Sequence, residues 1–184
     1  PISNEKIYDS LMLGRSYPEF LPDGSIKSFT IQYIDWHNIE NNVFHIVEEF
    51  TVEREDGQGT IRPDIVLFVN GIPFGVIECK RASINMDQGI SQMLRNQKET
   101  HIPQLFKYTQ VLMSTNKNET KYATCHTPKR FWSIWREEDE GWLQTNLSKA
   151  VLDRLPTNQD KNIITLFHPE RLLELTEYFI ILDK

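Results

Sequence analysis

The feature that most constrains this chain is a pair of apolar runs joined by Asn70-Gly71, within residues 61–81 (IRPDIVLFVNGIPFGVIECKR). Asn-Gly between two segments rich in β-branched and aromatic residues is a strong short-range signal for a β-hairpin. Pro63 falls early in the first run, where a strand tolerates a missing N–H donor. The stretch therefore predicts two antiparallel strands that are close together in both sequence and space.

Three of the charged residues in this hairpin are candidates for chemistry: Asp64 in the first strand, and Glu78 and Lys80 at the end of the second. Side chains alternate along a strand, so Glu78 and Lys80 share one face. The apolar residues predicted on the same faces are Val76 and Phe74 beside Glu78, and Val66 and Phe68 beside Asp64.

Whether the two acidic residues meet depends on the register of the hairpin. A strict two-residue loop at Asn70-Gly71 pairs Asp64 with Ile77. A three-residue loop, or one bulge, pairs Asp64 with Glu78 and brings their Cβ atoms to about 5 Å. We predict the odd-length connection or the bulge, because only that register lets the carboxylates act together.

Two carboxylates at that separation repel one another unless they share a hard cation, which prefers oxygen ligands. Mg²⁺ keeps several waters and lowers the pKa of a bound water. Lys80 would orient that water or stabilise developing negative charge. These roles suit hydrolysis of a phosphodiester, although an acidic strand residue and an E-x-K pair are also common on solvated protein surfaces.

The bulk composition is that of a globular domain, with 184 residues of which 39% are hydrophobic and 25% charged. The net charge of -6 and the pI near 5.4 argue against a free-standing nucleic-acid binder, although a bound cation or a partner would supply local positive charge. No long apolar run or signal peptide is visible, and the two cysteines have no metal-ligand spacing. We therefore expect a reduced, cytoplasmic protein with no membrane partner.

The rest of the chain mixes predicted strands and helices, which indicates an α/β or α+β fold. Helices are predicted over residues 5–13, 84–99, 103–108, 146–155 and 168–181, and strands over 28–36, 43–53, 111–114, 122–125 and 131–135. Residues 156–162 (PTNQDKN) have the composition of a linker.

Arg62-Pro63-Asp64 followed by Glu78-Cys79-Lys80 matches the PD-(D/E)xK nuclease pattern. The intervening IVLFVNGIPFGVI closely resembles the amino-terminal nuclease region of type I restriction enzyme restriction (R) subunits. Stretches 42–53 and 102–115 also resemble that region, and 168–184 resembles the junction that leads into the motor domains. The resemblance therefore covers nearly the whole chain.

The resemblance implies a restriction-endonuclease-like mixed sheet flanked by helices. It also implies Mg²⁺ bound by Asp64, Glu78 and the backbone carbonyl of Cys79. Gln104 and Tyr108 fit the downstream Q-x-x-x-Y motif of the family, and their i, i+4 spacing would put both on one helix face, against the site or the DNA backbone. The alternative is that Tyr108 is a core residue and Gln104 a surface residue.

Nucleases of this kind often carry a glutamate on an early helix. Glu5 would fill that position if the first helix is intact, and we expect that helix to be partly missing. Glu48 and Glu49 lie on a predicted strand instead.

The resemblance divides the chain into a nuclease domain at 1–155 and a linker and helix at 156–184 that lead toward motor domains absent here. The chain has no G-x-x-x-x-G-K-[ST] loop, so ATP is expected to act only through those motor domains. The expected partners are double-stranded DNA and the modification and specificity subunits of the complex.

Three functions compete. The first is Mg²⁺-dependent endonucleolytic cleavage of double-stranded DNA, as a type I site-specific deoxyribonuclease. The second is a non-catalytic docking module of the same assembly, and the third is a DNA-repair nuclease of the same superfamily. The presence of Asp64, Glu78 and Lys80 favours the first, and the restriction-like flanks argue against the third.

Overall fold

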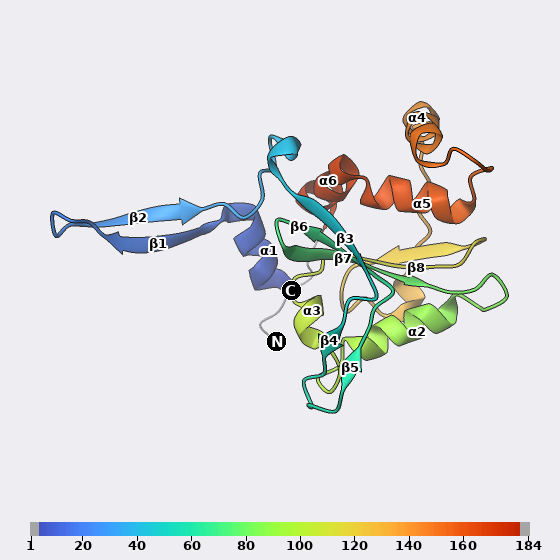
Figure 1. The fold of residues 1–184 in the computed structure, drawn as a ribbon, viewed down its shortest axis with the longest axis horizontal. Coiled ribbons are helices and arrows are strands. Elements are labelled where there is room, and N and C mark those ends of the chain that lie inside the picture. The colour runs from blue at the N-terminus through green and yellow to red at the C-terminus, as the bar shows by residue number, and fades with distance from the viewer. Residues whose placement is uncertain (1–3, 181–184) are drawn as a thin grey trace.

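A five-stranded mixed sheet, with strand order β3-β6-β7-β8-β9, organises the computed structural model, which describes residues 4–180 (Figure 1). Neighbouring strands are antiparallel except β7 and β8, which are parallel. The strands are β3 (Phe44–Glu48), β6 (Ile65–Val69), β7 (Ile72–Cys79), β8 (Val111–Thr115) and β9 (Thr120–Ala123). The mixed sheet flanked by helices that the sequence predicted is confirmed.

Helices cover both faces of this sheet. Figure 1 shows α5 (Asn158–Phe167) and α6 (Pro169–Phe179) on one side, and α2 (Asp87–Asn96) and α3 (Pro103–Phe106) on the other. Helix α2 lies in the crossover between the parallel strands β7 and β8, a connection that is usually helical. Because both faces are covered, the central strands are almost continuously apolar.

The alternation of side chains along the strands separates two buried clusters. The α5/α6-side cluster includes Leu67, Ile77 and Met113 of the sheet together with helix residues such as Leu166 and Leu172. The α2-side cluster includes Val66, Val76 and Leu112 together with Ile90 and Phe106. The alternation fixes which residues of the hairpin face α2, and this is the face to which Glu78 belongs.

The amino-terminal part is an extension of this body. Helix α1 (Asn4–Leu13) confirms the predicted first helix, and it leads into an antiparallel hairpin of β1 (Arg15–Phe20) and β2 (Ile26–Ile31). Every residue of both strands is exposed, and Figure 1 shows the hairpin reaching away from the sheet. The strand predicted over 28–36 is therefore shorter and earlier than expected, and its partner β1 was not predicted.

Two predicted strands differ from the observed elements. The strand expected over 43–53 breaks after β3, where Glu49 has a positive φ of 49°, and resumes as β4 (Val52–Glu53), paired with β5 (Thr60–Ile61). The strand expected over 131–135 is wrong, because 3₁₀ helix η2 (Lys129–Phe131) precedes a single bridge between Tyr122 and Ser133. A second 3₁₀ helix, η1 (Ile39–Asn41), lies before β3.

The carboxy-terminal helices also correct the prediction. Helix α4 (Glu140–Ala150) begins earlier than residue 146, because the Asp139 carboxylate accepts a hydrogen bond from Trp142 N (2.9 Å) and caps it. The linker expected over 156–162 is wrong, since α5 starts there. Helix α6 confirms the last predicted helix up to Phe179, and residue 181 lies outside the described residues. No helix within residues 4–180 combines the length and apolar character that crossing a membrane requires.

A capping box explains why the polar segment at the start of α5 is helical. Thr157 Oγ1 accepts from Asp160 N, and Asp160 Oδ2 accepts from Thr157 N (2.7 Å). Arg154 also donates two bonds to the Asp160 carboxylate (2.6 and 2.7 Å), and this lowers the pKa of Asp160, as the Thr157 bonds also do. The start of α5 is thus stabilised by one carboxylate.

We therefore expect Asp160→Ala to reduce the free energy of unfolding at pH 7 by about 0.5–2 kcal/mol, the usual range for a lost cap. A lowered carboxyl pKa contributes stability above the ordinary pKa, and this contribution is lost as the pH falls through the lowered value. The difference between wild type and variant should therefore narrow below about pH 4. Urea unfolding measures this difference in the free energy of unfolding. The control is Asp153→Ala, which changes an exposed carboxylate nearby. Equal losses of stability in the two variants would contradict the capping role.

Candidate active site

The turn of the β6–β7 hairpin has two residues, Asn70 and Gly71, both with positive φ (51° and 79°). This backbone conformation is the one that favours Asn-Gly in tight hairpins. The turn joins Val69 directly to its partner Ile72. Taken alone, this even-numbered connection would pair Asp64 with Ile77.

A β-bulge changes that register. Phe68 pairs with Pro73, but Leu67 pairs with Gly75, which leaves Phe74 as an extra residue. The register then continues to the pair Ile65–Ile77, so the next position places Asp64 opposite Glu78. The predicted bulge is confirmed.

The bulge also corrects one predicted face. Phe74 packs in the α5/α6-side cluster, whereas Val76 packs in the α2-side cluster. The prediction that Phe74 shares the face of Glu78 is therefore wrong, because the extra residue reverses the alternation before it. Val66 and Phe68 do lie on the α2 side, as predicted for the neighbours of Asp64.

Asp64 lies immediately before β6 and contacts the end of β7. Its Oδ2 atom accepts a hydrogen bond from Cys79 N (2.7 Å). Its backbone carbonyl accepts from Glu49 N (2.9 Å), so the segment after β3 holds the main chain of Asp64 in place. The Asp64 carboxylate is thus fixed beside the Glu78–Cys79 peptide.

Glu78 is almost completely buried, with 1% of its surface exposed. Burial raises the pKa of its carboxyl, and the neighbouring Asp64 carboxylate raises it too, while the hydrogen bond and charge of Lys80 oppose the shift. Lys80 Nζ donates to Glu78 Oε1. The structure therefore brings Asp64, Glu78 and Lys80 together.

Cys79 lies between Glu78 and Lys80, and its thiol is on the opposite face of the strand, within 3.9 Å of Gln159 Nε2. Burial raises the pKa of the Cys79 thiol to about 11, so the thiol is protonated at neutral pH. Cys79 would therefore contribute its backbone carbonyl to a metal site, and this role stays a prediction.

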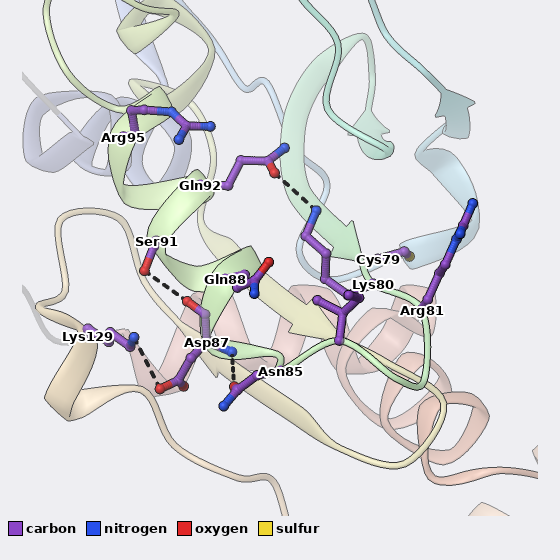
Figure 2. Close-up of a pocket in the computed structure, with 11 residues that line it drawn as sticks. Cys79, Lys80, Arg81, Asn85, Asp87, Gln88, Ser91, Gln92, Arg95 and Lys129 are labelled. Atoms are coloured by element: carbon purple, nitrogen blue, oxygen red, sulfur yellow. Dashed lines mark hydrogen bonds and ion pairs between the residues drawn. The ribbon is translucent and has the colours of Figure 1, made fainter.

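Gln92 of α2 is the site residue that the sequence reasoning missed. Its Oε1 accepts a hydrogen bond from Lys80 Nζ (3.0 Å), and Figure 2 shows the two side chains reaching toward one another. The sequence did place Gln92 on the first helix after the E-x-K strand. A helix that connects two parallel strands packs on one face of the sheet, and here that is the face of Glu78.

Gln104 and Tyr108 are not brought to this cluster. Helix α3 ends at Phe106, so the prediction that the two share one helix face is wrong. Gln104 Nε2 donates to Glu53 O (2.6 Å), and Tyr108 is 41% exposed, which also excludes the core alternative. A role for either residue in binding DNA stays a prediction.

The glutamates considered as further acidic ligands lie elsewhere. Glu5 on α1 and Glu48 at the end of β3 are exposed, and Glu49 pairs with Arg62 (3.5 Å). Among the described residues, no three His, Cys, Asp or Glu side chains form a group that could hold a metal. A cation at this site would therefore depend on two carboxylates, with backbone oxygen and water as further ligands.

An open groove of about 840 Å³ runs beside Lys80 and along α2 (Figure 2). The cations Lys80, Arg81, Arg95 and Lys129 line it. Its lining includes one acidic side chain, Asp87, and that carboxylate pairs with Lys129 (3.1 Å). The groove is thus locally positive on a chain whose net charge is -6.

Comparisons with known proteins agree on one family. The family described as type I restriction enzyme R protein N terminus matches residues 3–131. A relative in Methanocaldococcus jannaschii, with the provisional name type I restriction enzyme MjaIXP endonuclease subunit, is 29% identical over 97% of this chain and 18% of the relative. The type I restriction enzyme HindI endonuclease subunit of Haemophilus influenzae is 25% identical over 100% of this chain and 17% of the relative. The chain thus spans less than a fifth of the length of these relatives.

Proposed function

The chain belongs to the family of type I restriction enzyme R protein N termini, and on that premise we propose that it is the Mg²⁺-dependent nuclease module of an R subunit, which cleaves double-stranded DNA. The observation that carries this proposal is the bulged register of β6 and β7, which sets Asp64 opposite the buried Glu78. Both relatives are named as endonuclease subunits, which supports cleavage of DNA as the reaction.

The donor set fits Mg²⁺. Carboxylate oxygens are the ligands this ion prefers, and a buried Glu78 next to Asp64 is an arrangement whose mutual repulsion a divalent cation would relieve. Asp64, Glu78 and the carbonyl of Cys79 would hold it. When bound, the ion supplies a water of lowered pKa and neutralises charge on the phosphate.

The protein side chains would then orient the reactants. Lys80, held between Glu78 and Gln92, is placed to orient the attacking water or to stabilise negative charge developing on the phosphate. Gln92 would limit the rotamers of Lys80, because one hydrogen bond fixes the end of a long flexible side chain. Because Glu78 is buried, water cannot solvate its carboxylate. The cation and Lys80 would therefore be its charged partners.

The cationic groove extends this site toward a polymeric substrate. Arg81, Arg95 and Lys129 lie along it beside Lys80, where they would contact successive phosphates of a DNA backbone. Such contacts carry no sequence information, so this groove would bind DNA whatever its local sequence.

The wider assembly belongs to the same proposal. We expect ATP to act only through motor domains outside this chain, and the modification and specificity subunits to be the protein partners. A docking module or a repair nuclease would share the fold. The convergence of Asp64, Glu78 and Lys80 supports cleavage over docking, and the names of the relatives support restriction over repair.

Binding of the cation can be tested on this chain without DNA. We expect Mg²⁺ at ten times its dissociation constant to stabilise the wild type by about 1.4 kcal/mol, which corresponds to a rise in melting temperature of roughly 3–6 °C. Asp64→Asn should remove this rise, because one charged ligand is lost.

The control for that experiment is Glu19→Gln, a change of the same charge on exposed strand β1. It should keep the full response to Mg²⁺. An equal rise in Asp64→Asn and wild type would show that the cation binds elsewhere, and the proposed metal site would then be wrong.

A further inference from the structure

Helix α2 packs closely against the sheet at Gly89, next to the candidate active site. A Cβ atom built on Gly89 would lie 2.3 Å from Ser114 Oγ, 3.4 Å from Glu78 Cγ and 3.5 Å from Lys80 Cγ. The first distance is far below any tolerated contact, while the other two are at or near ordinary van der Waals separation. Of these three atoms, Ser114 Oγ is therefore the one that would have to move if alanine replaced Gly89.

Ser114 lies on β8 at the position that pairs with Glu78 of β7. It is fully buried, and its Oγ donates a hydrogen bond to Met86 O (3.1 Å), at the residue that precedes α2. This bond attaches the start of α2 to the strand beside Glu78. Gly89 follows Met86 by three residues. It has no side chain, so the Ser114 hydroxyl fits beside it.

Gln92 follows Gly89 by three residues, so the two share one face of α2. The distance between helix and sheet at Gly89 thus sets whether Gln92 Oε1 reaches Lys80 Nζ, a contact of 3.0 Å. We propose that Gly89 and Ser114 are a pair of positioning residues, whose close contact places Gln92 so that it holds Lys80 beside Glu78. This inference rests on the proposed function of the Glu78–Lys80 site.

A helix displaced by an added methyl group would move Gln92 away from Lys80. Because a misplacement of about 1 Å can lower a rate by about 100-fold, we expect Gly89→Ala to reduce single-turnover DNA cleavage by the complete enzyme by one to two orders of magnitude. Ser114→Ala removes the atom that clashes, so the double variant G89A/S114A should cleave as fast as S114A alone. In a Gln92→Ala background, Gly89→Ala should add little further loss, because the two changes act through one contact.

The matched control is Gly141→Ala, another glycine inside a helix. Its Cβ would have Asp139 Oδ1 at 3.5 Å as its nearest neighbour, which is an ordinary contact. Cleavage by this variant should stay within about twofold of wild type, since alanine is favoured over glycine in helices.

Three results would overturn the inference: cleavage by G89A within about twofold of wild type, no recovery in G89A/S114A, or a full additional loss from G89A in the Q92A background. If G89A fails to fold, the comparison of G89A/S114A with S114A decides the question alone. Melting temperatures of wild type, G89A, S114A and G89A/S114A test the steric contact without any measurement of activity. A wild type that does not cut DNA with Mg²⁺ would contradict the proposed function, whereas non-additive melting temperatures would still support the contact.

Discussion

Glu78→Ala is expected to lower Mg²⁺-dependent cleavage of plasmid DNA by the complete restriction enzyme by about 10²- to 10³-fold, the range found when a group that stabilises the transition state electrostatically is removed. Asp64→Ala should have a similar effect, because either change leaves one carboxylate where the site needs two. Lys80→Ala should also abolish most of the activity, since its ammonium is the one cationic side chain bonded to Glu78 among the described residues.

These variants should separate cleavage from the other activities of the assembly. Hydrolysis of ATP, which we assign to motor domains outside this chain, should continue at the wild-type rate. Glu19→Gln, on the exposed hairpin, should leave both activities unchanged. If all three site variants still cleave DNA with Mg²⁺, the assignment of the catalytic residues is wrong.

Phe74→Ala is expected to have the largest effect on stability, a loss of about 3–5 kcal/mol in the free energy of unfolding. Phe74 is 0% exposed in the α5/α6-side cluster, and its ring centroid lies 6.4 Å from that of Trp36. It is also the extra residue of the bulge, so its burial on that face opposes a return to the regular register. Domains of this kind have a total stability of about 5–15 kcal/mol, and the change would therefore remove a large part of it.

Urea unfolding of the chain measures this loss, and two comparisons interpret it. Phe74→Leu keeps most of the volume and should cost less than about 1.5 kcal/mol. Phe20→Ala, at a site that is 77% exposed, should stay within about 0.5 kcal/mol of wild type. A loss below 1 kcal/mol for Phe74→Ala would contradict the role of the bulge residue as an anchor.

The central hairpin could be predicted because its signals are local. Asn70-Gly71 indicates the turn, and the chemistry of Asp64 and Glu78 requires that they meet, so a bulge could be expected before its position was known. Its location at Phe74 depends on how well each residue packs against α5 and α6, and those helices lie about 90 residues further along the chain. No local pattern carries that information.

The supporting glutamine could not be found from spacing alone. Gln104 and Tyr108 fit the Q-x-x-x-Y pattern, but the helix that would unite them ends at Phe106. Gln92 reaches Lys80 because α2 packs closely on β7 and β8 at Gly89, which is a tertiary contact.

Elements at the two ends of the chain were missed for different physical reasons. Strand β1 contains Pro18 and faces solvent on both sides, so it lacks the alternation that marks a half-buried strand. The start of α5 is polar and begins after Pro156, which resembles a linker. Its helical structure depends on the capping box of Thr157 and Asp160 and on Leu166 and Phe167, which are buried against the sheet.

Anomalous diffraction from crystals of this chain soaked in Mn²⁺, a cation that shares the preference of Mg²⁺ for oxygen ligands, tests the central claim most directly. We predict one strong anomalous peak within coordination distance of both Asp64 and Glu78, and no peak there in Asp64→Asn crystals grown in the same way. A peak that contacts neither carboxylate, or one that persists unchanged in Asp64→Asn, would contradict the assignment of the bulged hairpin as the metal centre.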